Sequence, residues 1–230
     1  MFDTHDERET TQVVAIDGPA GAGKSSVARR VADELGFAFL DTGAMYRAAT
    51  WWALDREVDL DDQDALAANT RRMVLELTEQ DGKQCVRVGG RDVTEAIRTP
   101  EVTRQIYKLD QNPRVREHLV ALQRAFGAKH PCVAEGRDIG TVVFPGAKCK
   151  IYLDASLDER TRRRAAELES KGVRVDLELL RAEIHERDER SRTRAVAPLC
   201  RAEDATLVDT TSMTQDEVVE AIVELARAAL

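Results

Sequence analysis

Residues 13–26 read VVAIDGPAGAGKSS, and this stretch decides the fold. Four apolar residues typical of a buried strand are followed, within the next ten residues, by three glycines, a lysine and two serines. Gly18, Gly23, Lys24 and Ser25 occupy every fixed position of the pattern G-x-x-x-x-G-K-[ST]. The pattern lies between a strand-like run and a helix-like run, which is the context that a phosphate-binding loop requires. A glycine-rich turn that binds nothing is the alternative, but the context favours a nucleoside triphosphate site.

Each residue type in this loop has a physical task. Glycines allow backbone N–H groups to form a concave nest around phosphate oxygens. Lys24 would bring positive charge to the β- and γ-phosphates, and Ser25 would offer a hydroxyl to Mg²⁺. The helix that begins near Lys24 adds the positive end of its dipole. The predicted loop residues are Gly18, Pro19, Ala20, Gly21, Ala22, Gly23, Lys24, Ser25 and Ser26.

Composition narrows the classes of protein. The chain has 230 residues, of which 43% are hydrophobic and 33% charged, so one domain with insertions is expected. Its net charge of −8 gives no general attraction to nucleic acid or to an anionic membrane. No apolar run approaches the roughly 20 residues that span a bilayer, and the polar start MFDTHDERETTQ lacks the apolar stretch of a secretory signal. We therefore predict a cytoplasmic protein and, because no long apolar stripe stands out, a monomer.

The four cysteines suggest neither a metal site nor a disulfide framework. Cys85, Cys132, Cys149 and Cys200 are widely separated and lack paired metal-ligand spacing. Buried, reduced thiols in a cytosolic protein are the expectation.

Short apolar runs alternate with amphipathic segments along the chain. Because each run is too short for a typical helix, we predict strands there and helices between them. This alternation is typical of a parallel sheet covered by helices on both faces, and ligands of such sheets bind at the carboxyl ends of the strands. The predicted strands are 13–17, 37–41, 132–136, 150–154 and 206–210, and the predicted helices lie near 24–35, 44–55, 113–126, 157–171, 176–191 and 214–229.

One section interrupts the alternation. Residues 73–94 show period-two patterning around Asp81-Gly82 and again around Gly89-Gly90, which predicts a small antiparallel hairpin or meander inserted into the α/β core. The acidic residues 56–71 before it are expected to form a loop and a short helix.

Two further strand ends carry residues suited to a second anion. In DTGAMYR, Asp41 and Thr42 precede a helix; either could cap it, or Thr42 and Arg47 could help to hold an anion at its free N–H groups. In EGRDIGT, Arg137 and Asp138 follow a strand at the ligand-bearing edge. An arginine beside an aspartate can be a surface ion pair, but this position favours a site arginine.

Two arginine-rich helical segments, DERTRRR and ERDERSRTR, lie further along the chain. The residues that share a helix face are Arg160, Arg163 and Arg164 in the first segment and Arg187, Arg190 and Arg194 in the second. Such faces on successive helices could form a cationic clamp, because planar guanidinium groups match phosphoryl oxygens bidentately. A charged helical hairpin with internal salt bridges is the alternative.

Together, two anion sites and a mobile cationic cover predict phosphoryl transfer between two bound molecules. Positioning and charge neutralisation supply most of the catalysis in such a reaction, and a closing cover excludes water. No general base of high pKa is needed, because an acceptor phosphate oxygen is already a nucleophile. A nucleotide-dependent switch whose arginines dock a protein partner is the alternative from another class, although the sequence lacks the guanine-reading pattern N-K-x-D.

The chain also resembles the bacterial cytidylate kinase family over nearly its whole length. The segments that carry the resemblance are IDGPAGAGKSS, DTGAMYR, EAIRTPEV, NPRVREHLVALQRAF, EGRDIGTVVFP, KIYLDAS, RAVAPL and DTTSMT. Beyond the phosphate loop, GRDIGTVVFP and RAVAPL are the segments most specific to that family. The resemblance implies a P-loop NTPase fold of the α/β class: a parallel five-stranded sheet flanked by helices, a small inserted antiparallel β subdomain for the monophosphate, and an arginine-rich helical lid.

The resemblance further implies transfer of the γ-phosphoryl group of ATP to CMP or dCMP, with Mg²⁺, in pyrimidine nucleotide metabolism. Residues 18–26 would hold ATP. The implied catalytic residues are Lys24, Arg137, Asp138, Arg187 and Arg194. The implied CMP-binding residues are Thr42, Arg47, Arg116, Arg137, Asp138, Ser191 and Arg194, with Arg116 and Asp138 reading the cytosine ring. Arg160, Arg163 and Arg164 would belong to the lid.

By the same resemblance, one kinase domain would contain a core (12–55, 112–156 and 200–230), a monophosphate-binding insertion (56–111) and lid helices (157–195). Two residues depart from the family pattern. Tyr107 stands where a serine usually helps to read the base, and Ser191 where an aspartate usually contacts the sugar hydroxyl. We expect these departures to affect cytosine selection and the choice between CMP and dCMP, and to leave the transfer chemistry unchanged. Kinases for UMP, AMP or a sugar acid remain alternatives.

Overall fold

The computed structural model describes residues 12–80, 83–170 and 172–230, and the chain divides into two compact units. The larger unit takes the residues up to Leu40 and those from Phe126 onward, and the smaller unit takes Asp41–Ala125. Each unit has its own hydrophobic core. Contacts therefore group residues 41–55 and 112–125 with the predicted insertion at 56–111.

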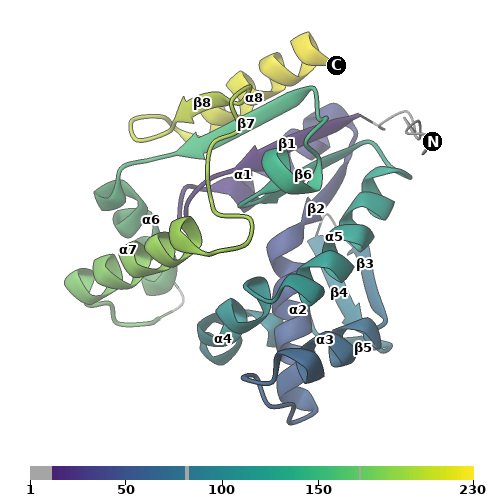
Figure 1. The fold of residues 1–230 in the computed structure, drawn as a ribbon. Coiled ribbons are helices and arrows are strands. Elements are labelled where there is room, and N and C mark those ends of the chain that lie inside the picture. The colour runs from purple at the N-terminus through teal and green to yellow at the C-terminus, as the bar shows by residue number, and fades with distance from the viewer. Residues whose placement is uncertain (1–11, 81–82, 171) are drawn as a thin grey trace. The chain divides into compact units, whose positions relative to one another are not determined.

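The larger unit is built on a five-stranded sheet in the order β2-β6-β1-β7-β8 (Figure 1). Its strands are β1 Val13–Asp17, β2 Ala38–Asp41, β6 Cys132–Gly136, β7 Cys149–Asp154 and β8 Thr206–Asp209. β1 runs parallel to both of its neighbours, β6 and β7, and is buried along its whole length. The predicted parallel five-stranded sheet is confirmed, and each strand ends within one residue of its prediction.

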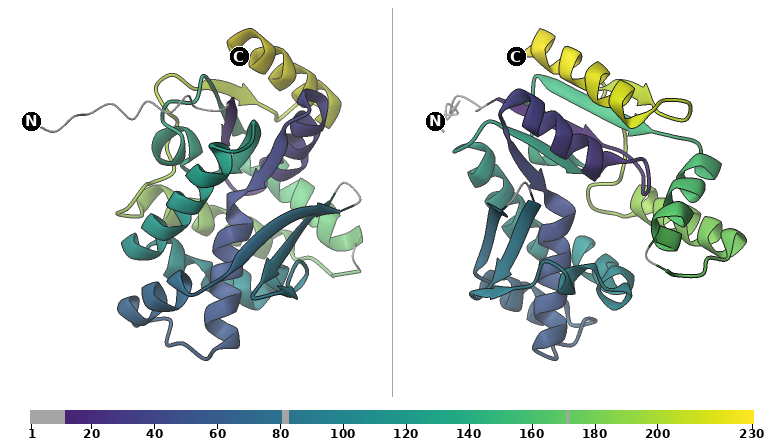
Figure 2. Two further views of the ribbon diagram at one scale, coloured as in Figure 1. Left: turned by 90° about the vertical axis from the view of Figure 1, so that its right-hand side faces the viewer. Right: turned by 180° about the vertical axis from the view of Figure 1, so that it is seen from behind.

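Helices α1 Lys24–Leu35 and α8 Gln215–Ala229 lie side by side against one face of this sheet (Figure 2). Their apolar stripes, which include Val27 and Val31 on α1 and Ile222 on α8, form the main core with the strand residues. α8 begins in a capping box formed by Thr214 and Glu217. These helices match the predictions for residues 24–35 and 214–229.

Helices α6 Leu157–Ser170 and α7 Leu177–Thr193 form a hairpin in the larger unit (Figure 1). Ala165, Leu180 and Ile184 give this hairpin a small core of its own. Much of the remaining surface is charged, so the position of the hairpin depends on polar contacts more than on apolar burial. Both helices were predicted.

The smaller unit contains the antiparallel sheet β3-β4-β5, formed by Leu75–Gln80, Lys83–Val88 and Arg91–Asp92. The predicted antiparallel insertion is confirmed, while its predicted turn at Asp81-Gly82 lies outside the described residues. Helices α2 Thr42–Asp55, α3 Gln63–Arg71 and α4 Pro100–Asp110, the 3₁₀ turn η1 Ala96–Arg98 and most of α5 Pro113–Gly127 complete the unit. Helix α2 contacts α3, α4 and β4 and supplies Trp52 to the core.

The sequence-based prediction misses the short turn η1 and two further elements. The first is α4, although Thr99 caps it, Pro100 begins it and apolar residues recur at helical spacing. The second is a π-helical turn, η2 Ile139–Val143, which follows β6. Its first N–H groups are bound by Asp17 from another strand, so no local pattern announces it.

Within the described residues, no helix is long and apolar enough to cross a membrane. All four cysteines lie in the described residues and are thiols that form no disulfide. Cys132 and Cys149 are buried in strands, and burial raises their pKa to about 12 and about 11. The prediction of buried thiols is confirmed for Cys132 and Cys149, but Cys85 is only half-buried. It is wrong for Cys200, which is exposed in the irregular segment after α7.

Candidate functional site

Polar residues gather where the parallel strands of the larger unit end. Asp17 at the end of β1 is in register with Gly136 on β6 and with Tyr152 on β7, and Ile16 is in register with Glu135. Because these strands are parallel, the loop after β1 and the segment after β6 leave the sheet at one edge. This is the edge at which such sheets bind ligands.

The phosphate loop leads from β1 into α1 through backbone conformations that favour glycine. Gly18, Gly21 and Gly23 have φ values of 150°, 76° and 91°. A Cβ on Gly18 would lie 2.0 Å from the carbonyl oxygen of Leu153, so no side chain fits there. Gly23 is the N-cap of α1 and has no side chain to accept from the first N–H groups of the helix, which leaves these groups to an anion.

Lys24 is buried at the start of α1. Its Nζ donates to the carbonyl oxygen of Pro19 at 2.6 Å, so the amine lies within the loop. Burial is the main cause that lowers the pKa of Lys24 to about 7; the nearby Arg137 and Arg187 act in the same direction, and Glu135 opposes them. Several cations therefore crowd the loop, and a bound polyanion would stabilise all of them.

Ser25 and Glu135 form a hydrogen-bonded pair of oxygen groups beside the loop. The Ser25 hydroxyl donates to Oε1 of Glu135 at 2.5 Å, and Glu135 is buried. A hydroxyl and a carboxylate fit Mg²⁺, which prefers oxygen and takes its remaining ligands from water and phosphate. In the part of the chain that the structure describes, no group of three or more His, Cys, Asp or Glu side chains could hold an ion alone.

Asp17 connects β1 to the segment that follows β6. Its two carboxylate oxygens accept the N–H groups of Ile139 and Gly140, both at 2.7 Å. Burial raises the pKa of Asp17 to about 6, although both hydrogen bonds act to lower it. Asp17 thereby fixes the turn that directly follows Arg137 and Asp138.

Arg137, Asp138 and Arg194 come together in the larger unit. NH2 of Arg194 lies 3.1 Å from Oδ1 of Asp138, and both side chains are buried. Nε of Arg194 donates to the carbonyl oxygen of Ala197 at 2.6 Å. Burial lowers the pKa of Arg137; Arg194 also lowers it, while Glu135 acts in the opposite direction. The structure thus brings three predicted site residues into one charged group.

Helix α7 carries two more of the predicted residues. Arg187 is exposed, yet it lies near enough to Lys24 to lower the pKa of that amine. The Ser191 hydroxyl donates to the carbonyl oxygen of Arg187 at 2.9 Å, one turn earlier in the helix. The carbonyl oxygen of Ser191 accepts the N–H of Leu199 at 2.8 Å, which ties the segment after α7 back to the helix.

The three arginines predicted to share a face of α6 have different partners. Arg160 is buried and contacts the phosphate loop, where its NH1 donates to the carbonyl oxygen of Ala20 at 2.9 Å. Arg164 pairs with Glu167 at 2.6 Å on the surface of the same helix. The alternative of a charged hairpin with internal salt bridges therefore describes all three arginines, because Arg160 pairs with Asp188 on α7 and Arg163 with Glu159, and it also describes Arg190, which pairs within α7.

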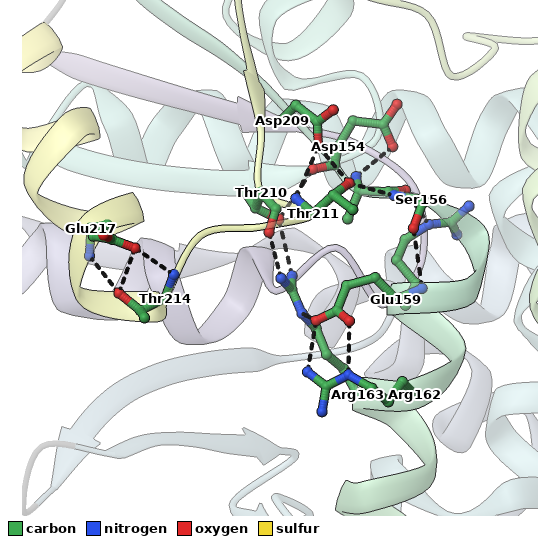
Figure 3. A network of polar contacts seen from close by, with 12 residues as sticks. Asp154, Ser156, Glu159, Arg162, Arg163, Asp209, Thr210, Thr211, Thr214 and Glu217 are labelled. Atoms are coloured by element: carbon green, nitrogen blue, oxygen red, sulfur yellow. Dashed lines mark hydrogen bonds and ion pairs between the residues drawn. The ribbon is translucent and has the colours of Figure 1, made fainter.

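Arg163 links α6 to the segment after β8 (Figure 3). Its NH1 and NH2 donate to the hydroxyl and carbonyl oxygens of Thr210 at 3.0 and 2.6 Å. Glu159 pairs with both Arg162 and Arg163, and these contacts lower the pKa of Glu159 to about 2. Thr210 in turn donates to the carbonyl oxygen of Asp154. This network anchors the start of the hairpin to the ends of β7 and β8.

In the smaller unit, Asp41 caps α2. Its carboxylate accepts the N–H of Ala44 at 2.7 Å and pairs with NH2 of Arg47 at 2.8 Å. The capping alternative is thus confirmed for Asp41, and Thr42 is a buried residue in the first turn. Within the described part of the chain, Nε of Arg47 is buried without a hydrogen-bond partner, so this donor could still bind an anion.

The other predicted residue of the smaller unit is Arg116 on α5. It is buried, and its guanidinium carbon lies 5.6 Å from the centre of the Tyr46 ring. Tyr107, which replaces the expected serine, is half-buried on α4. Arg98 had no predicted role, yet NH2 of Arg98 lies 3.9 Å from Asp41.

Sequence reasoning also assigned no role to Asp17, Glu135 and Asp188. Asp17 is the last residue of β1 and Glu135 the last but one of β6, so both lie at the ligand-bearing edge, and that position could have identified them. Asp188 lies inside the run ERDERSRTR, where arginines dominate the pattern. Its importance depends on burial against α6, which no local signal indicates.

The glycine loop of the larger unit lies between the central strand of a parallel sheet and an uncapped helix, and it contains a buried lysine. These features define a P-loop nucleotide-binding fold. The arginines around the loop are typical of phosphoryl transfer. The family model described as Cytidylate kinase matches residues 14–228, and the chain belongs to this family.

Relatives support this assignment. The cytidylate kinase of Geobacillus sp. (strain WCH70) is 48% identical over 92% of this chain and 95% of its own length. The bifunctional pantoate ligase/cytidylate kinase of Prochlorococcus marinus (strain MIT 9313) is 50% identical over 94% of this chain, which spans 43% of that protein. A solved structure of an uncharacterized protein from Eubacterium ventriosum ATCC 27560 covers 94% of this chain and 99% of its own, with a TM-score of 0.52 at 14% identity, and shows the fold alone.

Proposed function

We propose that the chain transfers the γ-phosphoryl group of ATP to CMP or dCMP, giving ADP and CDP or dCDP. Membership of the cytidylate kinase family supports the reaction. The observation that carries the mechanism is the crowding of positive charge at the phosphate loop, where burial, Arg137 and Arg187 together depress the pKa of Lys24. A purely structural loop gains nothing from such crowding, whereas a triphosphate is stabilised by it.

The donor is assigned to residues 18–26. Backbone N–H groups of the loop and the uncapped start of α1 would bind phosphate oxygens, and Lys24 would neutralise the β- and γ-phosphates. Ser25, with Glu135 beside it, would hold Mg²⁺, and the ion would supply further positive charge to the same oxygens when bound.

The acceptor is assigned, as the family resemblance implies, to the residues Thr42, Arg47, Arg116, Arg137, Asp138, Ser191 and Arg194. The unpaired Nε of Arg47 supports a second anion, because a phosphate oxygen would satisfy it. Asp138 and Arg116 are assigned to the cytosine ring.

The transfer itself needs no general base. An oxygen of the acceptor phosphate attacks the γ-phosphorus, the bond to the β-phosphate oxygen breaks, and ADP leaves. Lys24, Arg137, Arg187 and Arg194 would share the charge that spreads over the transferring group. The hairpin α6–α7 would act as the lid that excludes water, within the division into core (12–55, 112–156, 200–230), insertion (56–111) and lid (157–195).

A coupled assay of ADP release across CMP, dCMP, UMP and AMP tests the substrate. CMP and dCMP should be the best acceptors, and a higher kcat/KM for UMP or AMP would refute the assignment. A nucleotide switch, the alternative from another class, would hydrolyse ATP slowly and would not respond to CMP. We further propose that the protein acts as a cytoplasmic monomer in pyrimidine nucleotide metabolism.

The two departures from the family pattern define a second test. Ser191→Asp would restore the expected carboxylate near the acceptor sugar, and Tyr107→Ser the expected hydroxyl. The first variant should change the ratio of CMP to dCMP turnover, and the second should change discrimination against UMP. If neither ratio moves, these positions do not read the acceptor.

A further inference from the structure

Arg160 and Asp188 form a buried ion pair that contacts the phosphate loop. NH1 of Arg160 lies 2.5 Å from Oδ2 of Asp188, and the two side chains are 6% and 2% exposed. Oδ1 of Asp188 accepts the N–H of Ala20 at 2.9 Å, while NH1 of Arg160 donates to the carbonyl oxygen of Ala20 at 2.9 Å. Side chains from α6 and α7 therefore hold both backbone polar groups of one loop residue.

Burying the two charges of this pair costs desolvation free energy, and the hydrogen bonds of the pair offset that cost. Each carboxylate oxygen of Asp188 has a partner, and Nε of Arg160 donates to the carbonyl oxygen of Ala155 at 2.9 Å. Even so, a buried ion pair generally adds little net stability compared with apolar residues of the same size. What the pair contributes is a fixed loop conformation, because its two directional hydrogen bonds hold the backbone of Ala20 in place.

The loop is shaped to accept α6 at this point. Gly21 has a φ of 76°, and a Cβ there would lie 3.3 Å from Cβ of Arg160. The N–H of Ala20 is directed to Asp188, so it is not among the donors for a phosphate. The loop conformation and the position of α6 are thus fitted to each other.

We propose that Arg160 and Asp188 are positioning residues for the phosphate loop. They act through the Ala20 backbone, which sets the conformation in which the later loop N–H groups and Lys24 meet the donor phosphates. Asp188 also directly follows Arg187, so the same contact fixes the part of α7 from which Arg187 reaches toward Lys24. The inference rests on the donor half of the proposed function.

The first experiment uses the wild-type protein without nucleotide. Amide hydrogen exchange, measured by NMR, should show the Ala20 N–H exchanging at least about tenfold more slowly than an unprotected amide, because a buried carboxylate accepts it. Exchange at the unprotected rate would overturn the proposal whatever the variants do.

The second experiment compares Asp188→Asn with Asp158→Asn by ADP titration calorimetry. Asp158 also pairs with an arginine across the hairpin, Arg181, but this pair is exposed and does not touch the loop. Asp188→Asn should weaken ADP binding about tenfold at unchanged stoichiometry, since a charge-assisted contact is lost. The control should stay within about twofold of the wild type.

Arg160→Lys provides a second route if Asp188→Asn does not fold. It keeps the charge and loses the planar guanidinium group that reaches three acceptors, so ADP affinity should fall several-fold. An unchanged Kd in the folded variant, or a lower stoichiometry with an unchanged Kd, would show a merely structural role and overturn the proposal. ADP binding is measured without CMP, so a wild type that binds ADP but does not phosphorylate CMP would refute the proposed function alone.

Discussion

The helices that follow β1 and β2 begin in different ways. α1 begins after Gly23, which has no side chain for the first N–H groups, and a buried lysine lies at the helix start. α2 begins after Asp41, whose carboxylate accepts the N–H of Ala44 and pairs with Arg47. The same strand-to-helix step therefore leaves one helix start for an external anion and fills the other with an anion of the chain itself.

The charges at the two helix starts follow from this difference. At α1, burial and neighbouring arginines lower the pKa of Lys24, and the opposing charges of Glu135 and Asp17 do not offset them. At α2, Asp41 already neutralises Arg47, and among the described residues the buried Nε of Arg47 has no hydrogen-bond partner. We therefore expect the α1 site to dominate nucleotide binding and chemistry, and Asp41 to act mainly on stability.

Replacing the buried lysine should have the largest effect. Lys24→Ala should lower kcat by about 10²–10³-fold, because the charge developing on the transferring oxygens loses a fixed cation. CMP affinity, measured by calorimetry, should change far less. Turnover comparable to that of the wild type would refute the role of Lys24 and remove the contrast between the helix starts.

The capping carboxylate of α2 should matter for stability instead. Asp41→Ala should lower the free energy of unfolding by about 3 kcal/mol, because both a helix cap and a largely buried ion pair are lost. Asp62→Ala is the matched control, since Asp62 caps α3 in the same unit from an exposed position and should cost only about 1 kcal/mol.

Urea unfolding monitored by fluorescence suits this pair, because both tryptophans of the chain, Trp51 and Trp52, lie on α2. Asp41→Asn should fall between the two alanine variants, as asparagine caps well but cannot form the ion pair. Equal losses for Asp41→Ala and Asp62→Ala would mean that the ion pair with Arg47 contributes nothing.

What the sequence predicts well is local. The apolar strands, the glycine loop and most helices depend on neighbouring residues, and they were predicted to within one or two residues. The contacts that position the site are distant: Asp188 lies 168 residues from Ala20, and Asp17 lies 122 residues from Ile139. The face shared by Arg160, Arg163 and Arg164 was read from spacing alone, but packing gives each a different partner.

Proton uptake on nucleotide binding gives a smaller effect. In the free protein the pKa of Lys24 is about 7, against an ordinary value of 10.5, and a polyanion favours the charged amine. ADP binding should therefore take up as much as about one proton at pH 8 and almost none at pH 6. Calorimetry in two buffers of different ionisation enthalpy measures this, and Lys24→Arg should abolish it.

The same pKa fixes a trend in stability. Between pH 7 and 10.5 the unfolded chain binds more protons at Lys24 than the folded chain does, so the free energy of unfolding without nucleotide should rise with pH across this window. Lys24→Arg should flatten that rise. An identical slope in both proteins would mean that Lys24 is already charged in the free site.

The smallest effect concerns Gly21, the residue at which the phosphate loop comes close to α6. Gly21→Ala and Gly172→Ala introduce a methyl group at nearly the same φ, 76° and 77°, in one unit, but nothing lies within 4 Å of a Cβ on Gly172. Both should lose about 1 kcal/mol to backbone strain. Gly21→Ala should lose about 0.5 kcal/mol more, since its methyl presses on Arg160 at 3.3 Å, and it alone should weaken ADP binding. If the two variants match in both urea unfolding and ADP affinity, the close approach of α6 does not constrain the loop. The conformation that leaves the start of α1 uncapped would then depend only on the backbone freedom of the glycines.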